Sequence, residues 1–455
     1  MLTTKVSLLN ILNTYISKIL SNSFFSSSIE ISNSDFNSLL QGFLNSTEFF
    51  FWSDRPNNKT FCTFGRTLTI DESLSGSDLN IVLTKIIDSS KFENTSSVIP
   101  FIFSAQKFPA KERSNFWDAF KNNDWFIPQY VISNIDNNYV FTAYSEINNS
   151  TQADILIIIQ KLLDQFSSET KIVNSNLKIL GSFKYPQWEE WNKIINKSIR
   201  YIESGEIEKV VLGRYCDLEF SSDFHIGHYL LKLTERQSNS INYGIKRNDT
   251  LFFGATPEKL FSLKNNILKA EAVAGSISRG ENDSADEKLA NELLKSSKNV
   301  REQSSVLKFL VSQLADISEK IEYENNPKIK KLRSIQHLIS KIEAVLKPDV
   351  SIIEIIERLF PTPAVCGFPK ERAIDIIQNL ESFDRGLYAG ILGWITPQYE
   401  SEFAVAIRSA FLKDRKLRAF AGCGIIKESE SEAEFLETEL KFKTIISLFE
   451  NENIN

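Results

Sequence analysis

Residues 421–441 read AGCGIIKESESEAEFLETELK, an apolar run with two closely spaced glycines followed by an acidic segment. The run 421–426 is typical of a strand, and the acidic segment has the apolar spacing of a closing helix over 429–450. Backbone without side chains can approach a ligand closely and point its amide hydrogens at an anion. The glycines therefore indicate either the capture of a carboxylate or an ordinary tight turn.

The predicted closing helix carries Glu434, Glu437 and Lys441 at positions i, i+3 and i+7, so that their side chains project from one face. Such a face is often a solvated charged stripe, but its carboxylates can also hold a metal ion. The glycine-containing strand directly before the helix favours the second interpretation.

Glu302 lies in a segment whose apolar residues recur at helical spacing, which predicts one long helix over 285–317. A glutamate beside an apolar stripe is usually a rim residue. If Glu302 instead faces Glu437, two carboxylates and waters make an oxygen-rich, octahedral site of the kind that Mg²⁺ prefers.

Lys209 and Glu258 both stand at the ends of predicted apolar strands. Lys209 begins the strand 209–215, and Glu258 lies in the turn between the strands 251–254 and 260–263. Desolvation at such a position favours the neutral forms of lysine and glutamate. The pair therefore either supplies a base and an acid for catalysis or consists of two surface residues.

The remaining pattern divides the chain at about residue 180. Residues 1–180 are rich in Asn, Ser, Phe and Ile and contain no chemical motif, whereas 181–455 alternate amphipathic helices with short apolar strands. In the first region we expect an amphipathic helix near 8–20, surface loops over 23–34 and strand-like stretches at 98–104 and 131–144. In the second we also expect a helix over 188–204 and a strand over 335–346.

Composition excludes several classes of partner. The 455 residues carry a formal net charge of −6 without a block of Lys or Arg, which argues against binding nucleic acid or an anionic membrane. The longest aliphatic run, 155–159, is far too short to span a bilayer. We therefore expect a soluble protein that acts on small molecules.

The four cysteines and three histidines lack the spacing of a disulfide framework or a zinc site. A reducing cytoplasm is the compartment that fits this cysteine usage.

Nine segments, in one order, resemble the chorismate-binding enzymes, a family that includes isochorismate, salicylate, anthranilate and aminodeoxychorismate synthases. The segments are EKVVLGR (208–214), FFGATPEKLF (252–261), EAVAGSISRG (271–280), KNVREQ (298–303), HLISKIEA (337–344), LFPTPAVCGFPKERA (359–373), ESFDRGLYAGILGW (381–394), FAVAIRSA (403–410) and the stretch 421–441. The resemblance implies an α+β fold like that of anthranilate synthase component I, a single large domain with two large, mostly antiparallel sheets wrapped by helices. In such a fold the region 1–180 contributes to the same domain as the catalytic region 181–455.

The resemblance also implies roles for the charged residues. Lys209 would be the general base that deprotonates the attacking water, and Glu258 the general acid that protonates the departing ring hydroxyl. Glu302 and Glu437 would hold Mg²⁺, with Glu434 close to it, and the metal would bind the ring carboxylate of chorismate.

The substrate contacts follow in the same way. Arg408 would pair with the side-chain carboxylate, because its planar fork suits a bidentate contact. The other implied contacts are Tyr388, Lys441, Gly422 and Gly424 for the carboxylates, and Gly275 and His337 for the ring.

Within the family, three positions resemble the water-using isochorismate synthases. Lys209 stands where anthranilate synthases have glutamine, and Ala274 where aminodeoxychorismate synthases have a nucleophilic lysine. Ala364, in PTPAVCGFPKE, departs from the GTxSGAPK and TxSGIP strings of ammonia-using members and salicylate synthases. We expect Ala364 to shape a site for water rather than ammonia.

Alternatives remain at this stage. A salicylate synthase shares the base, acid and metal residues but goes on to eliminate pyruvate, and a non-catalytic chorismate-binding module would need none of them. Gln303 departs from the histidine of many relatives. The long N-terminal region favours menaquinone over siderophore biosynthesis, and the family pattern implies a cytoplasmic monomer.

Overall fold

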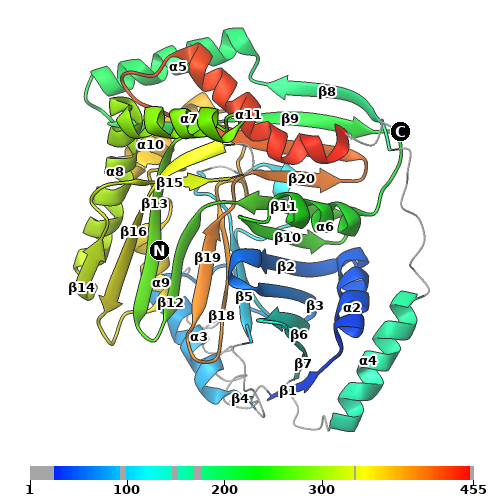
Figure 1. Cartoon of the computed structure of the whole chain (residues 1–455). Coiled ribbons are helices and arrows are strands. Elements are labelled where there is room, and N and C mark those ends of the chain that lie inside the picture. Colours follow the sequence, from blue (N-terminus) through cyan, green and yellow to red (C-terminus); the bar gives the residue numbers. More distant parts are fainter. Residues whose placement is uncertain are drawn as a thin grey trace, which may run out of the picture.

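The computed structural model describes residues 25–92, 99–111, 113–145, 152–167, 177–332 and 335–450. They form helices around two large antiparallel sheets (Figure 1), which is the α+β architecture predicted from the sequence. The predicted N-terminal helix near 8–20 lies outside the described residues. Within the described portion, no helix is long and apolar enough to cross a membrane.

The first sheet runs across Figure 1 and contains strands from both ends of the sequence. Each strand pairs antiparallel with the next, apart from a short parallel contact between β1 and β4. In spatial order the strands are β8 (Ile179–Tyr185), β9 (Lys209–Phe220), β21 (Lys416–Ile425), β20 (Ser409–Lys413), β11 (Thr250–Thr256), β10 (Ile241–Arg247), β2 (Glu48–Asp54), β3 (Lys59–Thr69), β6 (Asn123–Ile135), β7 (Asn138–Ser145), β1 (Phe25–Glu30) and β4 (Lys91–Phe92).

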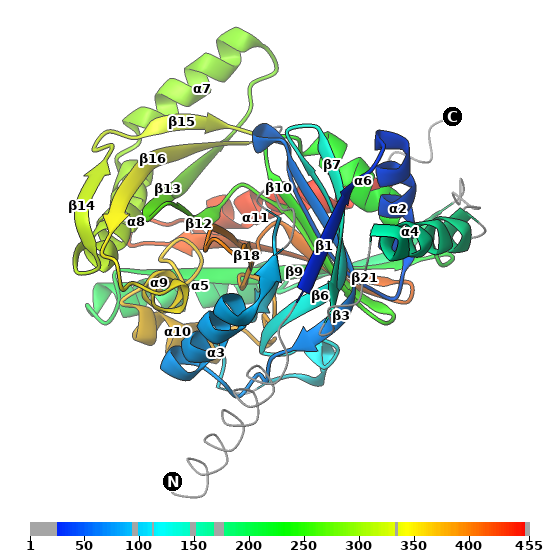
Figure 2. The same ribbon diagram turned by 90° about the horizontal axis from the view of Figure 1, so that it is seen from below.

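The second sheet runs down Figure 1 and is joined to the first because β5 pairs with the beginning of β6. Viewed from below, the two sheets form opposite sides of the molecule (Figure 2). The order of this sheet is β5 (Ile102–Gln106), β18 (Ile391–Ile395), β19 (Ser401–Val405), β12 (Lys259–Lys264), β13 (Ile267–Ser278) and β16 (Ile335–Leu346), with β14 (Ser318–Tyr323) and β15 (Lys328–Lys331) both paired to β16. The short β17 (Gly367–Phe368) pairs with the start of β9.

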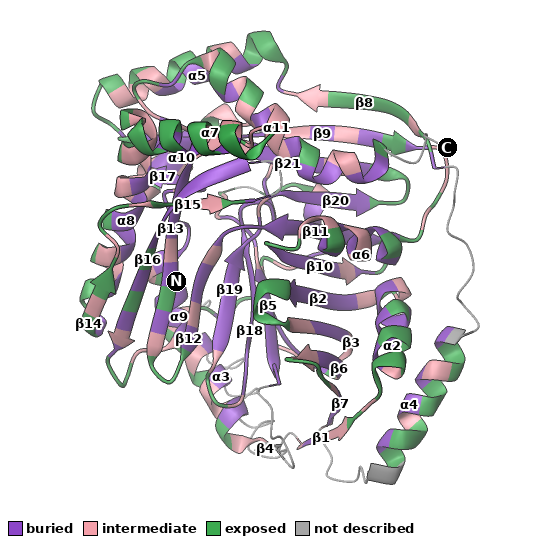
Figure 3. Ribbon diagram, in the orientation of Figure 1, coloured by how far each residue is buried: buried purple, intermediate pink, exposed green. Residues whose placement is uncertain are grey.

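Helices cover the outer faces of the sheets, so most strands are buried on both sides (Figure 3). In β2, Phe50 and Trp52 belong to the core between the sheets, whereas Phe49 and Phe51 pack under the helices outside. This explains the uninterrupted apolar run of β2, since a strand buried on both faces has no polar side. The helices are α2 (Asn33–Asn45), α3 (Gly76–Ser89), α4 (Gln152–Ser167), α5 (Trp188–Glu203), α6 (Ile226–Arg236), α7 (Asp283–Lys295), α8 (Ser297–Ala315), α9 (Ile352–Leu359), α10 (Lys370–Leu380) and α11 (Ser431–Glu450), with 3₁₀ turns at Arg55–Asn57 and Asn115–Trp117.

The predicted long helix over 285–317 is wrong, because the segment forms two helices, α7 and α8. Ser296 adopts an extended backbone between them, and its hydroxyl accepts a hydrogen bond from the amide of Asn299. Ser296 therefore caps α8, and capping serines interrupt a helical pattern that apolar spacing alone would extend.

The N-terminal region differs from its predictions in detail. The strand-like stretch 131–144 is confirmed as strand, and it forms the hairpin of β6 and β7, whose turn residues Asp136 and Asn137 both have positive φ. The expected loop 23–34 contains β1 and the start of α2. The strand expected at 98–104 begins later, as β5, while the elements predicted at 188–204 and 335–346 are confirmed as α5 and β16.

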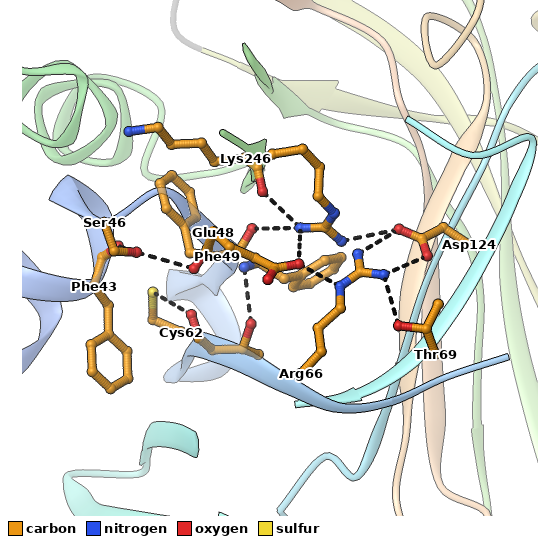
Figure 4. Close-up of polar contacts among 12 residues, drawn as sticks. Phe43, Ser46, Glu48, Phe49, Cys62, Arg66, Thr69, Asp124 and Lys246 are labelled. Atoms are coloured by element: carbon orange, nitrogen blue, oxygen red, sulfur yellow. Dashed lines mark hydrogen bonds and ion pairs between the residues drawn. The ribbon is translucent and has the colours of Figure 1, made fainter. Parts of the chain in front are cut away.

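A largely buried group of charges ties four strands of the first sheet together (Figure 4). Asp124 on β6 accepts two hydrogen bonds from Arg66 on β3, at 2.9 and 2.7 Å, and a third from Arg247 on β10 at 3.0 Å. Glu48 on β2 pairs with Arg66 Nε at 2.5 Å and lies 3.6 Å from Arg247 Nη1. Asp124 is only 3% exposed, so its removal would leave buried guanidinium groups without this partner.

We therefore predict that Asp124→Ala lowers the free energy of unfolding by about 3–5 kcal/mol, the range for breaking a buried ion pair. Denaturant unfolding followed by circular dichroism measures it. Glu322→Ala is the matched control, because Glu322 and its partner Lys320 are more than half exposed and such a pair contributes about 0–1 kcal/mol. Equal losses in the two variants would contradict the role assigned to Asp124.

Candidate active site

One cavity lies where the start of β9 and the end of β21 approach β13 and β16. Helices α8 and α11 and the loops before β12, β17, β18 and β20 complete its wall. Most of the site residues predicted from the sequence line it, namely Glu258, Gly275, Glu302, His337, Ala364, Tyr388, Arg408, Gly422, Gly424, Glu437 and Lys441. The fold therefore brings together residues that are more than 180 positions apart in the chain.

Lys209 and Glu434 lie just behind this wall. The amine of Lys209, 3% exposed, donates a hydrogen bond to Glu302 Oε1 at 2.8 Å. Glu434, 2% exposed, accepts one from Lys298 at 2.6 Å. Lys441 donates to Glu437, one turn earlier on the same helix, at 2.7 Å. Each carboxylate of the predicted metal site thus has its own lysine.

The charges of these residues act on one another. Burial and the neighbouring charge of Glu437 raise the pKa of Glu434 against the opposing effect of Lys298. Burial alone would raise the pKa of Glu437, but Lys441, Lys298 and Arg408 together lower it. Burial would likewise lower the pKa of Lys298, yet Glu434, Glu437 and Glu302 outweigh it and raise the pKa. The three carboxylates and the lysines paired with them therefore form one group of mutually interacting charges.

Gly424 and Gly422 stand where a Cβ atom would collide with side chains of the site. A Cβ atom at Gly424 would stand 2.6 Å from both Glu302 Oε1 and Lys209 Cε. A Cβ atom at Gly422 would stand 2.5 Å from the hydroxyl of Tyr388, and the Gly422 carbonyl accepts a hydrogen bond from Lys441 at 2.7 Å. Both glycines lie within β21, so the turn interpretation is wrong for them.

Glu258 is buried directly after β11, where the Thr256 hydroxyl accepts a hydrogen bond from its amide at 3.1 Å. Burial raises the pKa of its carboxyl to about 7, although a hydrogen bond donated by Thr362 at 3.3 Å and the charge of Lys209 both lower it. A carboxyl with this pKa still carries its proton in an appreciable fraction of molecules near neutral pH. It can therefore donate a proton to a leaving group.

Arg408 is a buried cation without an anionic partner among the described residues. Arg408 is 7% exposed. Within the described residues, its guanidinium is hydrogen-bonded through Nη2 to His337 Nε2 at 3.3 Å. Burial lowers its pKa to about 10, so the group is still charged at neutral pH. Because an unpaired buried charge is costly, the cavity wall at Arg408 is suited to an anionic ligand.

Sequence reasoning missed two residues that act on this site. Lys298 stands four positions before Glu302 in KNVREQ, but its partner Glu434 lies on another helix. Thr362, in the PTPAVCG string, contacts Glu258, which is 104 positions away. The i, i+4 spacing of Lys298 and Glu302 was the only local signal for either residue.

The carboxylate oxygens of the site are suitable ligands for a hard divalent cation, but they are not arranged around one point. Glu302 and Glu437 line the same cavity, and Glu434 interacts electrostatically with Glu437. Carboxylate oxygens are among the ligands that Mg²⁺ prefers. Within the described residues, however, no three acidic, histidine or cysteine side chains converge on one point. The lysines hold the carboxylates instead, and an ion with one or two protein carboxylates and several waters is compatible with this arrangement.

Comparisons with known proteins agree with the motifs. The family model described as chorismate binding enzyme matches residues 11–450. The isochorismate synthase MenF of Bacillus subtilis is 30% identical over 413 residues, which cover 88% of this chain and 87% of that protein.

Two solved structures share the fold. The structure titled as MenF, the menaquinone-specific isochorismate synthase from Escherichia coli, superposes with a TM-score of 0.79 at 21% identity, covering 98% of this chain and 100% of the other. Anthranilate synthase component I from Streptococcus pneumoniae gives 0.69 at 19% identity, covering 86% and 92%. These likenesses confirm the predicted fold class. With a family match that spans nearly its whole length, this chain belongs to the chorismate-binding enzymes.

Proposed function

We propose that this protein is an isochorismate synthase, an isomerase that adds water to chorismate and removes the ring hydroxyl. One observation carries the proposal: a buried glutamate of raised pKa lines a cavity that also presents an unpaired arginine, and a buried lysine donates a hydrogen bond to Glu302 in the wall of the same cavity. These groups are the base, the acid and the anion-binding residue that the reaction requires. The Bacillus subtilis relative bears the same activity in its name.

The substrate would be held through its two carboxylates. Arg408 pairs with the side-chain carboxylate, because it is a buried cation of the cavity wall for which no acidic partner is found in the described residues. Tyr388, Lys441, Gly422 and Gly424 surround the carboxylates, and Gly275, His337 and Ala364 border the ring.

The proton transfers would use Lys209 and Glu258. Lys209, in its neutral form, removes a proton from the attacking water, and Glu258 gives its proton to the departing hydroxyl while the ring double bonds shift. Water enters and water leaves, so substrate and product are isomers. In the structure Lys209 donates a hydrogen bond to Glu302, and its nitrogen needs a free lone pair before it can accept a proton from water.

Glu302 and Glu437 would hold Mg²⁺, with Glu434 close by. When bound, the ion would polarise the ring carboxylate and stabilise the charge that develops during the shift of the double bonds. Lys441 and Lys298 balance the carboxylates in the structure as it stands, and Glu434 keeps Lys298 beside the site.

The menaquinone pathway is the setting we infer, with the protein acting as a cytoplasmic monomer on chorismate. The match to a menaquinone-specific synthase over almost the full length of both chains supports this setting. A salicylate synthase remains the second candidate, because it needs the same base, acid and metal residues. It differs in the fate of the product.

The proposal predicts that purified protein with chorismate and Mg²⁺ forms isochorismate, and neither salicylate nor pyruvate, because the reaction stops at the hydroxyl exchange. Chromatography of the products measures this. EDTA should abolish the activity and Mg²⁺ restore it, since the carboxylates alone cannot polarise the substrate. Added ammonium should give no anthranilate, and appreciable pyruvate or anthranilate would contradict the assignment.

Lys209→Gln should lower kcat by roughly 100- to 10,000-fold, the range for loss of a general base. Chorismate binding should remain, because it depends on Arg408 and the metal. Glutamine keeps much of the length and the polarity of the side chain but cannot take a proton. Lys193→Gln, on the exposed face of α5, is the control for the substitution itself. Near-normal isochorismate formation by Lys209→Gln would place the base elsewhere.

The pH profile should report Glu258. Its acid form is present below a pH of about 7 and is lost above it, so kcat/KM should fall on the alkaline side. Thr362→Val removes the hydrogen bond that favours the charged carboxylate, so the pKa rises and this limb moves to higher pH. Steady-state rates from pH 5.5 to 9.5 measure the limb.

Glu258→Gln serves as the reference for this series, because glutamine has no proton to lose and the alkaline limb should disappear along with most of the activity. An alkaline limb that stays in place in Thr362→Val would mean that another group controls it.

A further inference from the structure

His337 connects the bulge of β13 to Arg408. Its Nδ1 lies 3.2 Å from the carbonyl oxygen of Gly275 and 3.0 Å from the hydroxyl of Ser276, and its Nε2 lies 3.3 Å from Arg408 Nη2. The strand register shifts between Ala274 and Ser276, and Gly275 there has a φ of +72°. This irregularity turns the Gly275 carbonyl toward the imidazole ring.

The two neighbours of the ring determine where its proton lies. A guanidinium group has only donors, so Nε2 must accept the hydrogen bond from Arg408. A backbone carbonyl only accepts, so Nδ1 must carry the hydrogen and donate it to Gly275. Both contacts therefore select the same neutral tautomer, with the proton on Nδ1.

We propose that His337 is a positioning residue, which in its neutral Nδ1–H form holds the Arg408 guanidinium in the orientation that receives the substrate carboxylate. This inference rests on the proposed function, in which Arg408 binds that carboxylate. His337 takes no part in the proton transfers, because its one lone pair on nitrogen is occupied by Arg408.

The electrostatic surroundings keep the ring neutral. Burial lowers the pKa of His337 well below its ordinary value, and the charges of Arg408, Lys441 and Lys330 lower it further, while the Gly275 carbonyl opposes them. A protonated ring would place an Nε2 hydrogen against the guanidinium, which would repel it in both charge and hydrogen bonding.

The need for such a partner comes from the isolation of Arg408. Carboxylates hold several other buried arginines of the described chain in place, as Glu381 does for Arg385 and Asp124 for Arg247. A carboxylate beside Arg408 would compete with the substrate for the guanidinium. A neutral acceptor orients it and leaves its charge available.

NMR spectroscopy can identify the tautomer of His337 without catalytic turnover. The chain has three histidines, so a long-range ¹H–¹⁵N spectrum of the ¹⁵N-labelled protein contains three ring patterns, and His337→Gln identifies the one from His337. We expect a neutral ring protonated at Nδ1 that does not titrate between pH 5.5 and 8. A ring protonated at Nε2, or one that titrates in this range, overturns the proposal.

Kinetics test whether the ring acts through Arg408. His337→Met removes the acceptor and should raise the KM and the dissociation constant for chorismate roughly 10- to 100-fold, with a smaller change in kcat. His337→Gln can present an amide oxygen to Arg408 and should therefore recover most of the binding that His337→Met loses. His228→Gln, at an exposed position, is the matched control.

A double-mutant cycle completes the test. In an Arg408→Ala background, His337→Met should add little further loss, because the residue it positions is gone. Additive losses, equal defects in His337→Met and His337→Gln, or a loss confined to kcat would each overturn the proposal. A wild-type protein that makes no isochorismate would contradict the proposed function alone, since the tautomer is read independently of catalysis.

Discussion

The pairing of β9 with β21 is the constraint on which the site depends. Gly424 lies opposite Val211 and Ile425 opposite Val210, which places the glycine beside the start of β9, where Lys209 stands. A shift of one residue in this register would direct a side chain at the Lys209–Glu302 pair and turn the neighbouring residues to the other face. Because α11 follows β21 after a short connection, the same register also fixes where Glu434 and Glu437 enter the site.

Charge pairing makes this arrangement possible in a buried place. Glu302, Glu434 and Glu437 would repel one another strongly in a cavity of low polarity if each were not matched by a lysine. The site is therefore built as an internally balanced set of charges. Arg408 is the exception, and its neutral partner His337 leaves a positive charge available for the substrate.

The sequence predicted the type of most elements in the second region, because apolar spacing and glycines mark strands and helices locally. The secondary-structure predictions failed where one local sequence feature is compatible with two different structures. Ser296 fits a helix interior by pattern yet caps α8, and Asp136 with Asn137 could continue a strand but form a hairpin turn. The site residues came from family motifs, and the structure places most of them at one cavity, while their catalytic roles stay predictions. Contacts such as Thr362 with Glu258 join distant segments, and no local pattern encodes them.

The motif-poor N-terminal region reaches the site through packing. The ring of Trp117 stacks on Phe420 of β21 at 5.8 Å, and Phe420 stacks in turn on Tyr388 of the cavity wall at 5.0 Å. The indole nitrogen of Trp117 also donates to the carbonyl of Asp384 at 2.9 Å, and a Cβ atom at Gly386 would stand only 2.1 Å from the indole ring. An aromatic ring of the N-terminal region thus packs against the loop that carries Tyr388 and helps to fix its position. A region without catalytic motifs can in this way support the active site. Such support depends on shape and volume, which many apolar sequences can supply, and this explains why the region shows no motif.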